Sequence, residues 1–159
     1  MSFQKAVQPY QAPAVAGDFA AHNPNASMLA CEGALVSGTD GVTVGVFAWA
    51  DADGKVSNKK TAGARIGFVH REQQASITAY LAEHGNQILP GQIITLAVAG
   101  DFWAHFPDGA EIGQNVFAKD ADGTLKASAA ATETDHTLTR FKVASKAAAG
   151  ELAKITTWE

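Results

Sequence analysis

The sequence predicts a mainly β protein: a jelly-roll-like sandwich or a small barrel, with one short helix and an extended N-terminal arm. Short apolar runs alternate with turn residues along most of the chain, which is typical of such folds. One pattern also occurs twice, because residues 46–56 and 116–125 both read Val-Phe-Ala, then Asp-Ala-Asp-Gly, then a polar residue and Val or Leu. Asp-Gly favours tight β-hairpin turns, so each copy predicts a hairpin. A length of 159 residues suits one domain with one core.

The composition narrows the class of protein. A hydrophobic share of 47% excludes a disordered chain, and a net charge of −4 argues against an electrostatic nucleic-acid binder. The single cysteine, Cys31, cannot form an internal disulfide, and we interpret it as a small buried apolar residue. We find no secretory signal and no apolar run of the roughly 20 residues that a membrane helix needs. We therefore expect no nucleic-acid or membrane partner.

The first 27 residues differ from the rest of the chain. They contain three of the five prolines by residue 24 and show no periodicity, which predicts an extended arm over residues 1–27 followed by a single β-rich domain over residues 28–159. The apolar side chains of the arm need a surface to cover, either the sheet of their own domain or a neighbouring subunit. The residues concerned are Phe3, Val7, Tyr10, Pro13, Val15 and Phe19.

The remaining chain divides into short strands. We expect them at residues 29–36, 42–49, 55–60, 66–70, 93–98, 102–106, 112–118, 137–143 and 152–158. Residues 42–49 are apolar on both faces, which predicts a strand covered on both sides. The lysines of residues 55–60 indicate an edge strand. Apolar residues at three- and four-residue spacing predict a helix over residues 72–84 that ends at Gly85, and residues 126–135 are expected to form a mobile loop.

The sequence carries no signature of catalysis. The two Asp-Ala-Asp-Gly copies offer carboxylates, but an EF-hand would need a glutamate where residues 62 and 131 are alanine. Neither a phosphate-binding loop, a dinucleotide fingerprint nor a nucleophile elbow is present. A dispersed catalytic triad is not excluded by sequence, and it is the weakest hypothesis. We therefore predict no catalytic residues, no cofactor and no metal.

Several motifs, in their order along the chain, resemble the capsid cement (decoration) proteins of tailed bacteriophages. They are Gly17-Asp18-Phe19, Glu32-Gly33-Ala34-Leu35-Val36, Val44-Gly45-Val46-Phe47-Ala48-Trp49, Gly67-Phe68-Val69-His70-Arg71-Glu72-Gln73-Gln74, Gly91-Gln92-Ile93-Ile94-Thr95-Leu96, Gly100-Asp101-Phe102-Trp103 and Ala121-Asp122-Gly123. The resemblance covers most of the chain and rests on structural motifs. It implies a β-rich protein that binds the outer surface of the capsid, often as a dimer, whereas other decoration families form trimers.

These observations lead to a structural hypothesis and a rival. We expect a cement protein that is made in the bacterial cytoplasm, binds the major capsid protein across capsomer boundaries on the outside of the head, and forms a homodimer or a trimer. Its predicted interface residues are Phe3, Val7, Tyr10, Pro13, Phe19, Phe102, Trp103 and Phe106. The alternative is a carbohydrate- or receptor-binding β-sandwich that uses the aromatic residues of the 102–106 strand, although these residues suit core and interface packing better.

Overall fold

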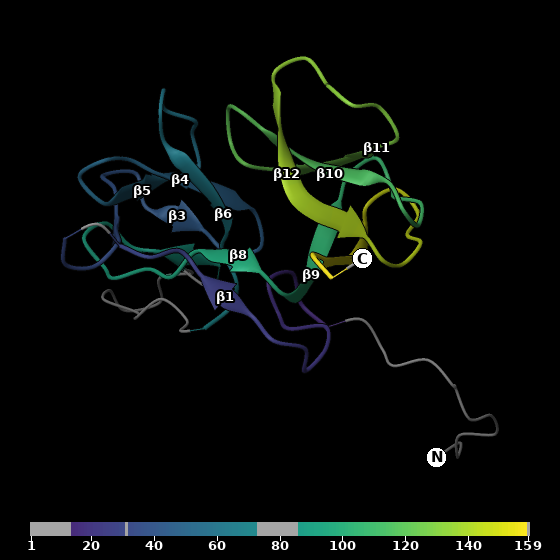
Figure 1. Ribbon diagram of the computed structural model, residues 1–159, viewed down its shortest axis with the longest axis horizontal. Helices are drawn as coiled ribbons and strands as arrows, with labels where there is room; N and C mark the ends of the chain where they lie inside the picture. The colour runs from purple at the N-terminus through teal and green to yellow at the C-terminus, as the bar shows by residue number, and fades with distance from the viewer. Residues whose placement is uncertain (1–13, 31, 73–85, 159) are drawn as a thin grey trace, which may run out of the picture.

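The computed structural model describes residues 14–30, 32–72 and 86–158, and its strands form two main sheets (Figure 1). The six-stranded sheet has the order β1 (Ala26–Ser27), β8 (Ala97–Ala99), β6 (Arg65–Phe68), β4 (Phe47–Ala50), β5 (Lys55–Ser57) and β2 (Val36–Ser37). The five-stranded sheet has the order β11 (Leu125–Ser128), β10 (Asn115–Lys119), β12 (His136–Val143), β13 (Glu151–Thr156) and β9 (Asp101–Phe106). A small third sheet pairs β3 (Val42–Thr43) with β7 (Gln87–Ile88). The predicted mainly β class is confirmed.

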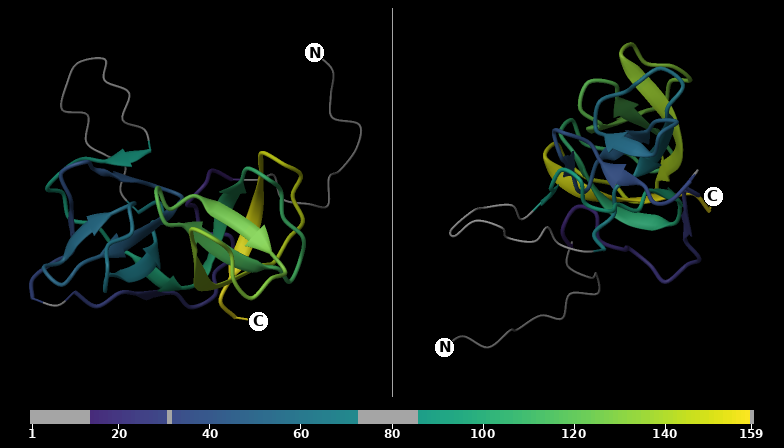
Figure 2. Two further views of the ribbon diagram at one scale, coloured as in Figure 1. Left: turned by 90° about the horizontal axis from the view of Figure 1, so that it is seen from above. Right: turned by 90° about the vertical axis from the view of Figure 1, so that its left-hand side faces the viewer.

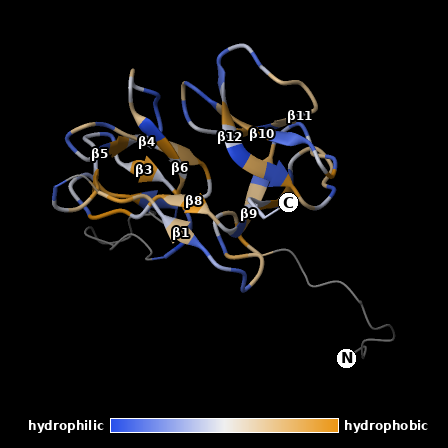
Figure 3. Cartoon of the chain, viewed as in Figure 1, coloured by the Kyte–Doolittle hydropathy of each residue, from blue (hydrophilic) through white to orange (hydrophobic). Residues whose placement is uncertain are grey.

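The two main sheets lie beside each other and share one hydrophobic core (Figure 2). The five-stranded sheet curls so that its outer strands β11 and β9 approach each other. Phenylalanine rings connect the sheets: Phe47 and Phe68 from the six-stranded sheet lie 5.3 Å apart, and Phe68 lies 5.1 Å from Phe102 of β9. Such tilted and edge-on ring pairs add to the stabilisation from burial. Figure 3 shows the hydrophobic colouring of β4 and β6, whereas β12 carries hydrophilic segments.

Strand β4 is buried on both faces, as its sequence predicts. Phe47 and Trp49 belong to the core shared by the sheets, whereas Ala48 and Ala50 belong to a second apolar cluster on the other side of the strand. The predicted strand over residues 42–49 is nevertheless interrupted. Gly45 adopts a positive φ of 83° and donates its N–H to the carbonyl of residue 69, so the chain turns there and separates β3 from β4.

Both Asp-Ala-Asp-Gly copies form hairpin turns, which confirms the prediction from the repeat. The first connects β4 to β5 and the second connects β10 to β11, both antiparallel. In the first turn, Asp51 Oδ1 accepts hydrogen bonds from the backbone N–H groups of Asp53 and Lys55. In the second turn, Asp122 Oδ1 accepts from the N–H and the hydroxyl of Thr124. Local carboxylate bonds of this kind are the usual chemistry of Asx turns.

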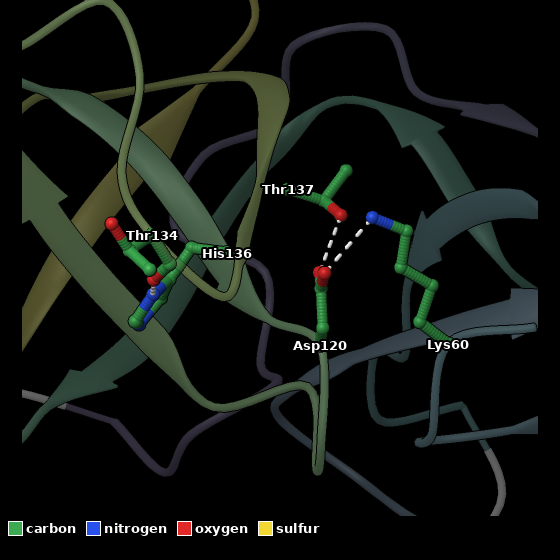
Figure 4. A network of polar contacts seen from close by, with 5 residues as sticks. All are labelled: Lys60, Asp120, Thr134, His136 and Thr137. Carbon is green, nitrogen blue, oxygen red and sulfur yellow. Dashed lines mark hydrogen bonds and ion pairs between the residues drawn. The ribbon is translucent and has the colours of Figure 1, made fainter.

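The second turn also joins the two sheets. The N–H of Phe47 in β4 donates to the carbonyl of Gly123 at 2.9 Å. Lys60 Nζ lies 2.9 Å from Asp120 Oδ2, and Thr137 donates its hydroxyl to the other carboxylate oxygen of Asp120 (Figure 4). Burial raises the pKa of Asp120, but these hydrogen bonds and the lysine charge outweigh it and hold the pKa below its usual range.

Three predictions for individual elements are wrong. Residues 55–60 do not form an edge strand, because β2 pairs with β5 in parallel and lies outside it. Of the described residues in the predicted strand 29–36, only Val36 belongs to a strand, β2. The first residues of the expected mobile loop 126–135 belong to β11, which pairs with β10. The predicted helix over residues 72–84 lies outside the described residues except for Glu72, and the described part of the chain contains no helix.

Candidate interaction surface

The segment over residues 15–28, here called the N-terminal strap, runs antiparallel to β8 and β9. Strands β8 and β9 follow each other directly through Gly100, so this one stretch of chain passes from the first sheet to the second. The strap pairs with both parts: Ala26 lies opposite Ala99 of β8, and Phe19 forms a bridge with Phe102 of β9. Because unpaired edges invite association with other strands, the strap protects both sheets along this side.

Additional hydrogen bonds fix the strap along its length. Its backbone pairs with Trp103, which accepts from the N–H of Gly17 at 2.7 Å and donates to the carbonyl of Asp18 at 2.8 Å. Near its middle, Asn23 Nδ2 donates to the buried carboxylate of Asp101 at 2.5 Å. The other oxygen of that carboxylate accepts from the hydroxyl of Thr156. The strap is thus bonded to the domain by backbone and side-chain groups.

An aromatic cluster lies under the strap. The ring of Phe19 is 5.2 Å from the rings of both His70 and Phe102. His70 is buried, and its Nδ1 has no hydrogen-bond partner among the described residues. Burial lowers the pKa of His70, and the carboxylate of Glu72, with Oε2 3.6 Å from Nε2, only partly opposes this effect. Burial therefore favours the neutral form of the His70 ring, which packs against Phe19 and Phe102.

Arg71, in the chain that follows β6, holds the start of the strap. Its backbone N–H donates to the carbonyl of Gly17, and its Nε lies 3.5 Å from Asp18 Oδ1. Its guanidinium also donates to Asn86 Oδ1 at 2.9 Å. Two apolar side chains of this part of the strap nevertheless face solvent, since Val15 is 49% exposed and Phe19 is 45% exposed. They form an apolar surface at the point where the described chain begins.

The structure distributes the predicted interface residues unevenly. Phe3, Val7, Tyr10 and Pro13 lie outside the described residues, and Phe19 is half exposed on the strap. Phe102 and Phe106 are fully buried in the shared core. Trp103 is 6% exposed, and Lys154 Nζ lies 5.2 Å from the centre of its ring. These three rings pack the fold and offer no free face on which a sugar could stack.

Other exposed apolar residues were not singled out from the sequence. They are Leu29, Ile93, Ile112, Leu138 and Trp158. The sequence contained one signal for these residues. Leu138 lies on the same side of β12 as Arg140 and Lys142, because residues two apart point the same way in a strand, and all three are exposed. Leu29 gave no such signal because it stands next to an apolar run that reads as a strand.

The described residues show no grouping of acidic, histidine or cysteine side chains that would hold a metal ion. The Asp51 carboxylate already accepts two backbone N–H groups in its own turn. Nor does the described chain include a helix long and apolar enough to cross a membrane.

The fold and this surface together define a β-rich protein with two main sheets, a strap paired along one side of both, and several exposed apolar side chains. The chain belongs to the XM1 gp53 minor capsid protein family, whose model matches residues 3–157. It is therefore a structural component of a bacteriophage capsid, and the family implies a non-enzymatic role. The family match confirms that the chain is related to phage capsid proteins, as its sequence motifs predicted.

A solved structure from a phage capsid supports the fold. A chain in the capsid of Myoviridae phage XM1 is similar over 99% of this chain and 98% of its own, with 19% sequence identity and a TM-score of 0.59. The N base of the head fiber gp8.5 of bacteriophage phi29 is more distant, with 13% identity, coverage of 84% of this chain and 93% of its own, and a TM-score of 0.42. No curated protein sequence matches.

Proposed function

We propose that this minor capsid protein is a cement protein that binds the outer surface of the phage head and stabilises the shell across capsomer boundaries. Its partner is the major capsid protein, and it acts as a homodimer, with a trimer as the second possibility. Membership of a minor capsid family supports the location in the virion. The observation that carries the proposal is the strap, which ends in two half-exposed apolar side chains, Val15 and Phe19.

The sequence before the strap contains further large apolar residues. Residues 1–13 contain Phe3, Val7 and Tyr10, and we assign them to an arm that docks on a neighbouring subunit. Full burial of a large apolar side chain contributes about 1.5–3 kcal/mol, and ordering a residue costs about 1–2 kcal/mol. The balance for an arm is therefore narrow and depends on its few large side chains. Many symmetry-related copies on one shell allow each contact to be weak.

Co-sedimentation with expanded heads that lack this protein tests the proposal. We compare the full chain with a chain that begins at Ala14, because this truncation keeps every hydrogen bond of the strap described above. Pelleting of the full chain alone supports both the cement role and the arm. Pelleting of both chains supports the cement role and places binding on the β domain. If neither chain pellets at micromolar concentration, the cement proposal fails.

Sedimentation velocity of the purified protein tests the oligomer. If the full chain is a dimer and the chain without residues 1–13 dissociates more readily, the result supports an arm that reaches the second subunit. A monomer at all accessible concentrations contradicts the homodimer.

A further inference from the structure

A groove of about 390 Å³ opens between the two main sheets, on the side where β1, β6 and β8 face β12. Its floor is apolar and includes Met28, Ile66 and Phe141. Leu29 lines it as well and is 84% exposed, which is the highest exposure of any large hydrophobic side chain among the described residues. A partner that covers an apolar groove and its exposed leucine removes apolar surface from water, which favours binding.

The charged residues of the groove all have the same sign. Arg65 and Arg140 line it, and no aspartate or glutamate among the described residues does, although the chain as a whole has a net charge of −4. The guanidinium of Arg65 donates to the carbonyl of Leu29 at 3.0 Å, which holds it at the rim. Arg140 is exposed and forms no ion pair with any acidic residue in the described ranges. Arginine pairs strongly and directionally with carboxylates.

We propose that this groove binds an extended, acidic segment of the shell protein, in which a carboxylate pairs with Arg140 and a neighbouring aliphatic or aromatic side chain covers Leu29. This inference rests on the proposed function and names the chemistry of its partner. A peptide suits the surface better than a small molecule, because apolar exposure continues beyond the groove. Leu138 lies two residues before Arg140 on the same solvent-facing side of β12 and is also half exposed.

Strand β12 supplies a matched pair of variants to test this. Arg140→Glu reverses a charge in the groove, and Lys142→Glu reverses another exposed charge on the same side of the same strand but outside the groove. Both changes lower the net charge by the same amount and leave the core intact. In co-sedimentation with heads that lack the protein, we expect Arg140→Glu to weaken apparent binding roughly ten- to hundredfold and Lys142→Glu to weaken it less than about threefold.

The outcomes separate the two proposals. If the unaltered chain pellets and the two variants bind equally, the groove inference is overturned and the cement role stands. If the unaltered chain does not pellet, both proposals fall. Leu29→Ser provides a second variant without a charge change, and it too should weaken binding.

Photo-crosslinking identifies the occupant. With p-benzoylphenylalanine in place of Leu29, we expect crosslinks on assembled heads to a shell-protein peptide that contains Asp or Glu within a few residues. Crosslinks to a second copy of this chain, or to shell peptides without acidic residues, would refute the assignment.

Discussion

Gly123, in the second Asp-Ala-Asp-Gly turn, offers the sharpest test of how the two sheets are joined. It has a φ of 73°, and a Cβ built on it would overlap the carbonyl oxygen of Phe47 and lie 2.9 Å from its carbonyl carbon. Gly54 occupies the same place in the first turn with a φ of 78°, but its Cβ would meet nothing closer than 3.4 Å. The repeat thus supplies an internal control with the same Asp-Ala-Asp-Gly sequence and a similar positive φ at the glycine.

Gly54→Ala should cost about 1–2 kcal/mol of unfolding free energy, the cost of placing an L-residue in the left-handed region. Gly123→Ala bears that cost and a backbone overlap that no side-chain rotation relieves. The turn must move away from β4, which breaks the hydrogen bond from the N–H of Phe47 to the Gly123 carbonyl and the bond from the N–H of Lys60 to the Asp120 carbonyl. At about 1 kcal/mol for each bond, we expect a total loss of about 3–4 kcal/mol.

Urea unfolding followed by tryptophan fluorescence measures this difference, since Trp49 and Trp103 are both buried in the folded chain. All variants are compared at one protein concentration, because assembly would raise the apparent stability. If Gly123→Ala loses no more stability than Gly54→Ala, the second turn is not wedged against β4. The description of the junction between the sheets would then be incorrect.

Three further predictions concern buried and exposed polar groups. Burial lowers the pKa of His70 below its ordinary value of 6.5, so at a pH between the two pKa values the unfolded chain binds more protons than the folded chain. The unfolding free energy should therefore fall as the pH drops from about 7 toward the folded-state pKa. His70→Gln should flatten this part of the plot of urea midpoint against pH. Asp101→Ala removes the acceptor for Thr156 and Asn23, and should lower the unfolding free energy by about 2–3 kcal/mol in urea titrations, whereas an unchanged midpoint would contradict the buried network. Lys60→Ala removes a solvent-exposed ion pair and should cost less than about 1 kcal/mol, with a smaller difference at high salt; a larger, salt-independent loss would count against this interpretation.

The sequence was most informative where structure depends on neighbouring residues. The two Asp-Gly turns were predictable because the turn chemistry lies within four residues. Strand β12, His136–Val143, alternates polar and apolar residues and differs from its predicted range by one residue. Burial of β4 on both faces could also be predicted, because its apolar residues fall on both sides of the strand.

Pairing between distant segments was not predictable. The lysines after β5 suggested an edge strand, but the parallel partner β2 covers that edge, and nothing local to residues 55–60 indicates this. Similarly, Gly45 ends a strand because the strap approaches it; a Cβ there would lie 2.8 Å from that of Ala16. For the candidate surface, the sequence identified Phe19 but not the groove, whose lining residues come from the strands β1, β4, β6, β8 and β12 and from the chain just after β1.

The strap also has a mechanical consequence. Its backbone bonds to Leu96, the residue just before β8, and to Trp103 of β9, so it spans the only place where one stretch of described chain passes directly from the six-stranded to the five-stranded sheet. A tension applied at residue 14 along the strand axis loads these hydrogen bonds together in shear, whereas a perpendicular pull breaks them one at a time, beginning at Gly17. Resistance to force at this end of the protein should therefore depend on the direction of the pull, being high along the strap and low across it.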